Sequence, residues 1–336
     1  MARQIVGFDI GNSALKICER DGNGLRLVCK PIPENMMVDD VSVAPHALSD
    51  LIKKTCSESH IRGKSACMAL PESRAFFRHV SLPPMSVKEL ELNLPYEFRD
   101  YIDGDPSGYV FDYAVDKIVR TEDGEPERME LYASCTEREA MVDTKETFRR
   151  SGRQLVCATP AAMALSRLVS LRVAEEPELT GTGIVFMDLG YDNISLSLYE
   201  GDLYQASRVI DIGLRELDQA IADLRGVDRY SASAYKRTNF EGVLDDPVCS
   251  DLYERIAIEV NKVINFYNFS NRSMDIQAMY LLGGGAHIPQ LVETLKSSAN
   301  LSVASIAELF PEPFRNYEEL PSCALAVAAM LEGEAI

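Results

Sequence analysis

The sequence predicts an α/β protein of two similar halves, with a small α+β domain inserted into the first half. An internal echo is the first observation. Residues 6–11 and 185–190 each read as an apolar strand that ends in Asp, an aliphatic residue and Gly, followed by a polar turn. The two aspartates, Asp9 and Asp188, lie 179 residues apart, about half of the 336-residue chain. The second observation is that strand and helix patterns alternate along both halves and change in texture near Phe76, which indicates an insertion.

The first half begins with a buried strand over residues 5–10, and a polar turn separates it from a second strand that starts at Ala14. A third strand is predicted over 25–30. Apolar spacing of the helical kind predicts a helix over 45–59, and a buried strand follows over 65–70.

The insertion begins with an alternating strand over 77–82. Ser86 and Glu89 then form the pattern of a capping box, which opens a helix. Pro95 interrupts the helical pattern, so we expect the helix to start or restart there. Two strands and an amphipathic helix complete the unit, over 109–115, 129–135 and 136–151.

The second half follows a helix opened by Pro160 and a polar boundary segment over 175–183. Its strands are predicted over 184–187, 194–199, 203–210 and 278–282, and its helices over 214–223, 230–238, 250–268, 289–297 and 323–331. The predicted domains are 1–73 (first half), 74–155 (insertion), 156–180 (return to the first half), 181–320 (second half) and 321–336 (a C-terminal helix that packs back on the first half).

The charge balance limits the partners of the chain. It carries 34 Lys and Arg against 52 Asp and Glu, a net charge of −18. Nucleic acid and anionic membrane surfaces attract clustered cations, so neither is an expected direct partner. The eight cysteines show no C-x-x-C spacing, which favours reduced thiols over a zinc site. No signal peptide and no apolar run of membrane-spanning length is seen, so we expect a cytoplasmic location.

The two echoed turns are suited to phosphate. Gly11 and Gly190 lack a Cβ, so backbone N–H groups can approach an anion closely. The carboxylates of Asp9 and Asp188 would repel a phosphate unless Mg²⁺ lies between the carboxylates and the phosphate. Mg²⁺ takes one or two carboxylates along with phosphate oxygens. Side-chain donors and a neutralising cation come from Asn12, Ser13 and Lys16. The alternative is two hairpin turns with solvated aspartates.

A run of three glycines, Gly283, Gly284 and Gly285, follows an apolar strand and precedes a helix. Such a run lets the backbone lie flat against a planar ring or a sugar, and the helix N-terminus adds partial positive charge. The alternative is a plain strand-to-helix loop. Neither a Walker A loop nor a dinucleotide fingerprint is present.

These motifs resemble those of a known superfamily. Residues 9–16, 188–190 and 281–286 resemble the two phosphate motifs and the adenosine motif of the actin/Hsp70/sugar-kinase superfamily. Within it, residues 77–86, 89–92 and 160–165 resemble the PilM type IV pilus assembly proteins and their FtsA-like relatives. The resemblance covers nearly the whole chain and implies an actin-like fold, with two duplicated α/β halves around a nucleotide cleft and an inserted small α+β domain.

The resemblance also implies ATP and Mg²⁺ as ligands. The phosphates would lie between two sets of residues: Asp9, Gly11, Asn12, Ser13 and Lys16 on one side, and Asp188 and Gly190 on the other. Asp9 and Asp188 would hold the metal. The remaining nucleotide contacts would come from Gly213 near the nucleotide, Lys236 at the ribose or base, and Gly283, Gly284 and Gly285 by the adenosine.

In function, the resemblance implies a cytoplasmic ATP-binding adaptor. It would hold the N-terminal cytoplasmic tail of a PilN-like inner-membrane protein and reach the membrane only through that partner. Self-association stays open. Phe76, Phe77 and the helix over 90–98 could form an apolar groove for the tail, or the core of the insertion.

Three departures from the family pattern bear on hydrolysis. Ser233 stands where a Glu often contacts the ribose, Asp192 adds negative charge beside the second phosphate turn, and Thr159 replaces an acidic residue before Pro160. An attacking water needs a group to orient it, so we expect ATP binding with slow or no hydrolysis.

The sequence disfavours three other functions. A small-molecule kinase needs an Asp base, and none stands in 157–161. A membrane-bound filament former like FtsA needs an amphipathic C-terminal anchor, whereas 331–336 is short and acidic. A chaperone would need a substrate-binding appendage after Leu331, and none is present.

Overall fold

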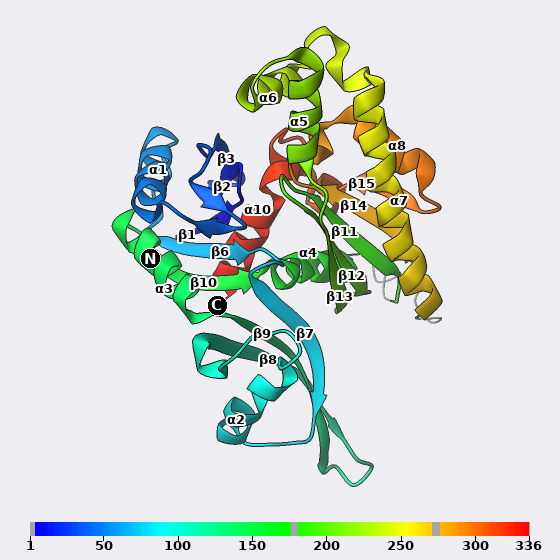
Figure 1. Cartoon of the computed structure of the whole chain (residues 1–336). Coiled ribbons are helices and arrows are strands. Elements are labelled where there is room, and N and C mark those ends of the chain that lie inside the picture. The colour runs from blue at the N-terminus through cyan, green and yellow to red at the C-terminus, as the bar shows by residue number, and fades with distance from the viewer. Residues whose placement is uncertain (1–3, 176–180, 271–275, 336) are drawn as a thin grey trace.

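Two five-stranded sheets of the same topology form the body of the protein (Figure 1). The computed structural model describes residues 4–175, 181–270 and 276–335. The first sheet has the order β10-β6-β1-β2-β3, with β1 (Ile5–Ile10), β2 (Ala14–Asp21), β3 (Gly24–Pro31), β6 (Ser65–Leu70) and β10 (Gln154–Pro160). The second has the order β13-β12-β11-β14-β15, with β11 (Gly183–Leu189), β12 (Ile194–Glu200), β13 (Leu203–Ile210), β14 (Ile276–Leu282) and β15 (Ser302–Ser305).

The strand pairings confirm the duplication that the sequence predicts. In each sheet, three consecutive strands pair antiparallel, and two later strands add in parallel beside the first of them. The strands β1 and β11 therefore hold the same central place, and each leads into one of the two echoed turns.

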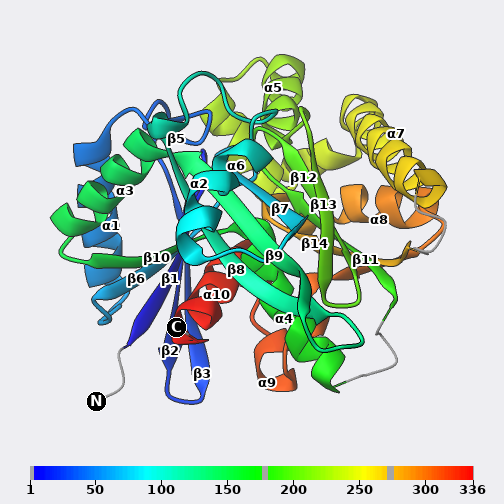
Figure 2. The ribbon, with the colours of Figure 1, turned by 90° about the horizontal axis from the view of Figure 1, so that it is seen from below.

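Helices fill the space around and between the sheets. In the first half, α1 (Pro45–Glu58) packs beside α3 (Arg138–Arg150), and Phe148 of α3 meets Phe8 of β1 with ring centroids 4.9 Å apart. On the other face, α10 (Leu320–Ala335) packs on β1, β2 and β6 and contacts α4 (Ala161–Glu175). Figures 1 and 2 show α10 between the two halves.

The contact between α10 and β1 depends on Gly7. A Cβ there would lie 1.8 Å from the Ala326 carbonyl oxygen, so the helix backbone sits directly on the strand. Residues of both sheets join α4 and α10 in one apolar cluster, which includes Ile5, Phe186 and Tyr199. This cluster ties the halves together.

The second half carries its own helices and core. They are α5 (Leu214–Arg225), α6 (Arg229–Thr238), α7 (Pro247–Ser270) and α8 (Pro289–Ser298), and a short α9 (Glu312–Arg315) precedes α10. Figure 1 shows α5 and α6 at the opposite end of the molecule from the inserted sheet.

The insertion has a three-stranded antiparallel sheet of its own, in the order β7-β9-β8, with a helix α2; the bounds are β7 (Ala75–Leu82), α2 (Val87–Glu97), β8 (Tyr109–Arg120) and β9 (Pro126–Glu137). The capping box at the start of α2 is confirmed: Ser86 accepts the Glu89 N–H, and Glu89 accepts the Ser86 N–H at 2.8 Å. The expectation that the helix starts or restarts at Pro95 is wrong. Pro95 lies in the last turn of one continuous helix, where its missing N–H affects only the helix end.

Of the two possibilities for Phe76, Phe77 and the helix over 90–98, the structure supports the core of the insertion and not an apolar groove. Leu90, Leu94 and Phe98 are buried in the core of the insertion. Phe77 stacks on Tyr132 and packs on Tyr204 of β13, with ring centroids 5.5 and 4.7 Å apart. These side chains therefore hold the insertion together and fasten it to the second half.

Strands β4 (Met37–Val38) and β5 (Val41–Ser42) pair antiparallel between β3 and α1. The candidate boundary over 175–183 includes residues 176–180, which lie outside the described part of the chain, and the domain boundaries stay a prediction. Within the described residues, no helix has the length and apolar character needed to cross a membrane.

Candidate functional site

The two echoed turns converge on one pocket, called here the phosphate pocket. Strands β1, β6 and β10 run parallel, so their carboxyl ends meet at one edge of the first sheet, and β11 of the second sheet ends opposite them. The pocket is lined by seven of the predicted residues: Asp9, Gly11, Asn12, Ser13, Lys16, Asp188 and Gly190. Both halves thus supply walls of the same cavity.

The charge of Lys16 interacts with both aspartates. Lys16 Nζ is 2.8 Å from Asp9 Oδ2, and the two side chains are 14% and 12% exposed. Burial raises the pKa of Asp188 to about 6; Lys16 opposes this shift, while Asp9 and Asp40 add to it. Burial by itself lowers the pKa of Lys16, but Asp9 and Asp188 outweigh it, and the pKa lies above its ordinary value. The lysine therefore stays charged and stands where a cation is needed.

The other five predicted residues lie outside the lining of this pocket and are Gly213, Lys236, Gly283, Gly284 and Gly285. Gly283 has a φ of +84°, and a Cβ there would lie 2.2 Å from Asp188 Oδ1, so this glycine makes room for the Asp188 carboxylate. A Cβ on Gly213 would lie 2.3 Å from the Tyr191 carbonyl oxygen. The absence of a Cβ at Gly283 and Gly213 therefore allows close packing against the second phosphate turn.

A larger polar pocket continues from the phosphate turn toward α5 and α6. It shares Asn12, Ser13 and Tyr191 with the phosphate pocket. The far wall consists of Arg215, Asp218, Arg229, Tyr230, Ser233 and Arg237, and the near wall of residues 31–35, 37 and 38. Ser233, which departs from the family pattern, therefore faces this space.

Two ion pairs organise that wall. Lys236 Nζ lies 2.6 Å from Asp218 Oδ1 and 5.9 Å from the centre of the Tyr191 ring. Asp192 pairs with Arg215 at 2.5 Å, so its charge beside the second phosphate turn is balanced by a neighbour.

Two carboxylates in the phosphate pocket were not among the residues predicted from the sequence. Glu72 accepts the Ala162 N–H at 3.1 Å and the Ser207 hydroxyl at 2.8 Å, and burial raises the pKa of Glu72 to about 7. It follows β6 after Pro71, so the rule that ligands bind at the carboxyl ends of parallel strands could have found it. Asp40 reaches the pocket from the β4–β5 turn, and no sequence pattern marks it.

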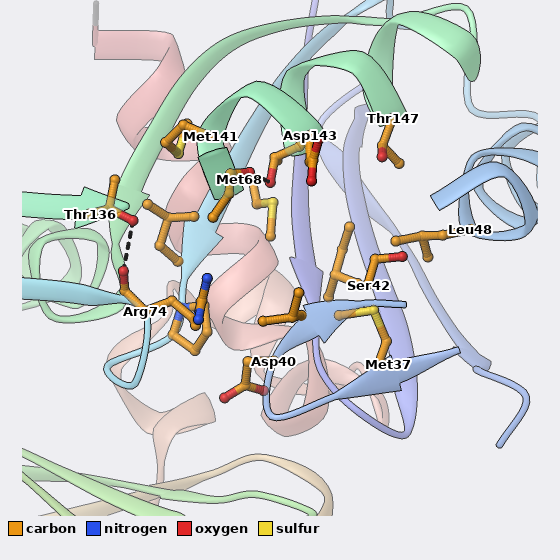
Figure 3. Close-up of a pocket in the computed structure, with 16 residues that line it drawn as sticks. Met37, Asp40, Ser42, Leu48, Met68, Arg74, Thr136, Met141, Asp143 and Thr147 are labelled. Atoms are coloured by element: carbon orange, nitrogen blue, oxygen red, sulfur yellow. Dashed lines mark hydrogen bonds between the residues drawn. The ribbon is translucent and has the colours of Figure 1, made fainter. Parts of the chain in front are cut away.

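A second cavity, called here the apolar pocket, lies on the other side of Asp40 (Figure 3). It is lined by the β4–β5 hairpin, α1, β6, α3 and the start of the insertion. Figure 3 shows Met37, Met68 and Met141 around it. The Ser42 hydroxyl is buried and makes no hydrogen bond within the described residues. An apolar cavity with a free hydroxyl suits an apolar segment that brings a polar group.

Comparison with known proteins identifies the family. A family model for the type IV pilus assembly protein PilM matches residues 7–319. The chain belongs to the PilM family. A solved structure titled as a PilM–PilN type IV pilus biogenesis complex contains a chain that is 25% identical, with 98% of each chain covered and a TM-score of 0.82.

More distant structures share the fold alone. The ethanolamine utilization protein EutJ from Carboxydothermus hydrogenoformans is 14% identical, with 98% of this chain and 90% of that chain covered and a TM-score of 0.61. MreB 5 of Spiroplasma citri bound to AMPPNP is 14% identical, with 100% and 97% covered and a TM-score of 0.55. Comparison with curated proteins gives no match. The predicted actin-like fold is confirmed.

Proposed function

We propose that this PilM-family protein is a nucleotide-binding adaptor of type IV pilus assembly that holds the N-terminal cytoplasmic tail of a PilN-like inner-membrane protein. The observation that carries the nucleotide part is the convergence of two phosphate-type turns from separate halves on one pocket. The family match favours this role over the small-molecule kinase or the filament former.

Magnesium ATP fits the residues present. The turn at Gly11, Asn12 and Ser13 offers donors to the phosphates, and Asp9 and Asp188 offer the two carboxylates that Mg²⁺ accepts in such sites. Among the residues that the structure describes, no group of three metal-ligating side chains exists, so phosphate oxygens and water would have to complete the coordination. Mg²⁺ would supply charge neutralisation of the phosphates. Lys16 would then turn from Asp9 toward the phosphates.

The base and ribose would occupy the polar pocket beside α5 and α6. Tyr191 and Ser233 line that space, and Lys236 stands behind it on Asp218. The three glycines would act by holding the second phosphate turn in place.

Hydrolysis is expected to be slow. Thr159 offers no carboxylate to orient a water. The nearby carboxylate of Glu72 is occupied by the Ala162 N–H and the Ser207 hydroxyl. A water-orienting group must be free to accept a hydrogen bond from the attacking water.

The partner's tail would occupy the apolar pocket. Its lining is mostly apolar, Ser42 can bond a backbone group of an extended peptide, and Asp143 adds negative charge at its edge. The net charge of −18 favours a tail that carries basic residues and disfavours direct binding to anionic lipid or nucleic acid. The protein would sit at the inner face of the membrane through this partner.

The nucleotide site is tested by titration calorimetry with Mg²⁺ and AMPPNP. We expect one site, and at least a tenfold loss of affinity in Asp188→Asn. The control is Asp251→Asn, which removes an exposed carboxylate of α7. Equal affinity in both variants, or no binding to the wild type, would refute the site.

The tail site is tested with a synthetic peptide of the N-terminal cytoplasmic residues of the PilN-like protein from the same genome. Met141→Asp places a charge in the apolar pocket and should abolish binding. Val142→Asp is the matched control on α3, because Val142 is 60% exposed and lines neither pocket. Binding that survives in Met141→Asp would exclude this pocket.

A further inference from the structure

Asp40 stands where the phosphate pocket meets the apolar pocket and lines both of them. Figure 3 shows it at the turn of the β4–β5 hairpin, beside the apolar pocket. The same hairpin gives Met37, Val41 and Ser42 to the lining of the apolar pocket. A movement of Asp40 would therefore move one wall of that pocket.

The phosphate turn holds Asp40 directly. Asn12 Nδ2 donates to Asp40 Oδ1 at 2.9 Å, and Asn12 Oδ1 accepts the Asp40 N–H at 2.9 Å. Ser73, in the turn after β6, donates to the other carboxylate oxygen at 2.5 Å. Both ends of the Asn12 amide are thus engaged by one residue of the hairpin.

The two turn residues of the hairpin have a backbone conformation that L-residues rarely adopt. Asp39 and Asp40 have φ values of +49° and +60°, a pair of left-handed residues of the kind found in type I′ turns. Glycine adopts that region freely, asparagine and aspartate adopt it more readily than other residues, and it costs L-residues in general about 1 kcal/mol or more each. The bonds to Asn12 and Ser73 help to hold Asp40 in this conformation.

A polyphosphate at the turn would compete with this arrangement. Asn12 cannot swing toward a phosphate without giving up a bond to Asp40. The negative charge of the phosphates also repels the Asp40 carboxylate, which lies in a part-buried position on the same pocket. Nucleotide binding therefore works against the state in which the hairpin forms the wall of the apolar pocket.

We propose that Asp40 couples the two pockets, so that nucleotide in the phosphate pocket weakens binding of the partner's tail in the apolar pocket. This inference rests on the proposed function and adds to it how one ligand regulates the other. By linkage, the tail weakens nucleotide binding by the same factor.

The test measures the dissociation constant of the tail peptide by fluorescence anisotropy, with and without saturating Mg²⁺ and AMPPNP. In the wild type we expect at least a fivefold weakening by the nucleotide. Asp40→Gly removes the carboxylate but suits the positive φ, so the turn is retained. This variant should reduce the effect below twofold, and it should bind AMPPNP alone at least as tightly as the wild type. A merely structural role would weaken AMPPNP binding instead.

The matched control is Asp39→Gly. Asp39 is the neighbouring turn residue, also has a positive φ, is exposed and lines neither pocket. It should keep the full fivefold effect. If Asp40→Gly unfolds, Asp40→Asn, which removes only the charge, should also lower the coupling.

The outcomes are distinct. Equal coupling in wild type and Asp40→Gly, or binding of both ligands to the wild type without any coupling, overturns the inference and leaves the proposed function standing. If the wild type binds neither ligand, the proposed function fails, and the inference falls with it.

Discussion

Replacing Glu72 by Gln should make the protein more stable at neutral pH. Burial, the largest effect on this carboxyl group, raises its pKa from 4.5 to about 7; the Ser207 and Ala162 hydrogen bonds oppose the shift, and Asp188 adds to it. The folded state therefore prefers the neutral form. The protonated Glu72 carboxyl group therefore makes its full contribution to the free energy of unfolding below about pH 4.5. This contribution is lost as the pH rises to about 7, and it does not change further above that pH.

The magnitude follows from the shift. A difference of one pKa unit corresponds to about 1.4 kcal/mol, so a shift from 4.5 to about 7 corresponds to about 3 kcal/mol. Gln has nearly the same shape. Its Oε1 can accept the Ala162 N–H, and its Nε2 can donate to the Ser207 oxygen. The variant therefore keeps the packing and removes only the ionisable carboxyl group.

The assay is urea unfolding at a series of pH values between 4 and 8, followed by far-UV circular dichroism because the chain has no tryptophan. The free energy of unfolding of Glu72→Gln minus that of the wild type should rise by about 3 kcal/mol between pH 4.5 and 8. A difference that does not change with pH would refute the reasoning, whatever its size.

Two further predictions concern the surroundings of Asp188. Gly283→Ala should lower the free energy of unfolding by about 2–4 kcal/mol, because the φ is +84° and the new Cβ would lie 2.2 Å from Asp188 Oδ1. The control is Gly22→Ala: Gly22 has a φ of +60°, but no atom lies within 4 Å of an added Cβ, so this variant should lower the free energy of unfolding by only about 1 kcal/mol. Equal losses in urea unfolding would show that the close contact at Gly283 is unimportant. Lys16→Met leaves Asp9 and Asp188 without their buried cation and should cost about 3 kcal/mol in the same experiment at pH 7; a variant as stable as the wild type would contradict the ion pairing.

Some features could be predicted from the sequence because they are encoded by neighbouring residues. The two Asp-x-Gly turns each follow a short apolar strand, and their repetition indicated the duplicated halves. The capping box of Ser86 and Glu89 lies within four residues. Period-2 and period-3.6 patterns located most strands and helices, because burial of one face of an element imposes that period on the local sequence.

The pockets needed the tertiary structure, because their walls come from segments with no pattern in common. Asp40 is hydrogen-bonded to Asn12, 28 residues away, and Glu72 to Ser207, 135 residues away. The apolar residues of α2 and Phe77 could equally have faced a partner, and only the packing of β7, β9 and β13 put them inside. Local sequence therefore determined the strands, the turns and the chemistry at their ends. The fold decided which charges lie close together, because electrostatic interactions depend on the distance between two groups in space and not on their separation along the chain.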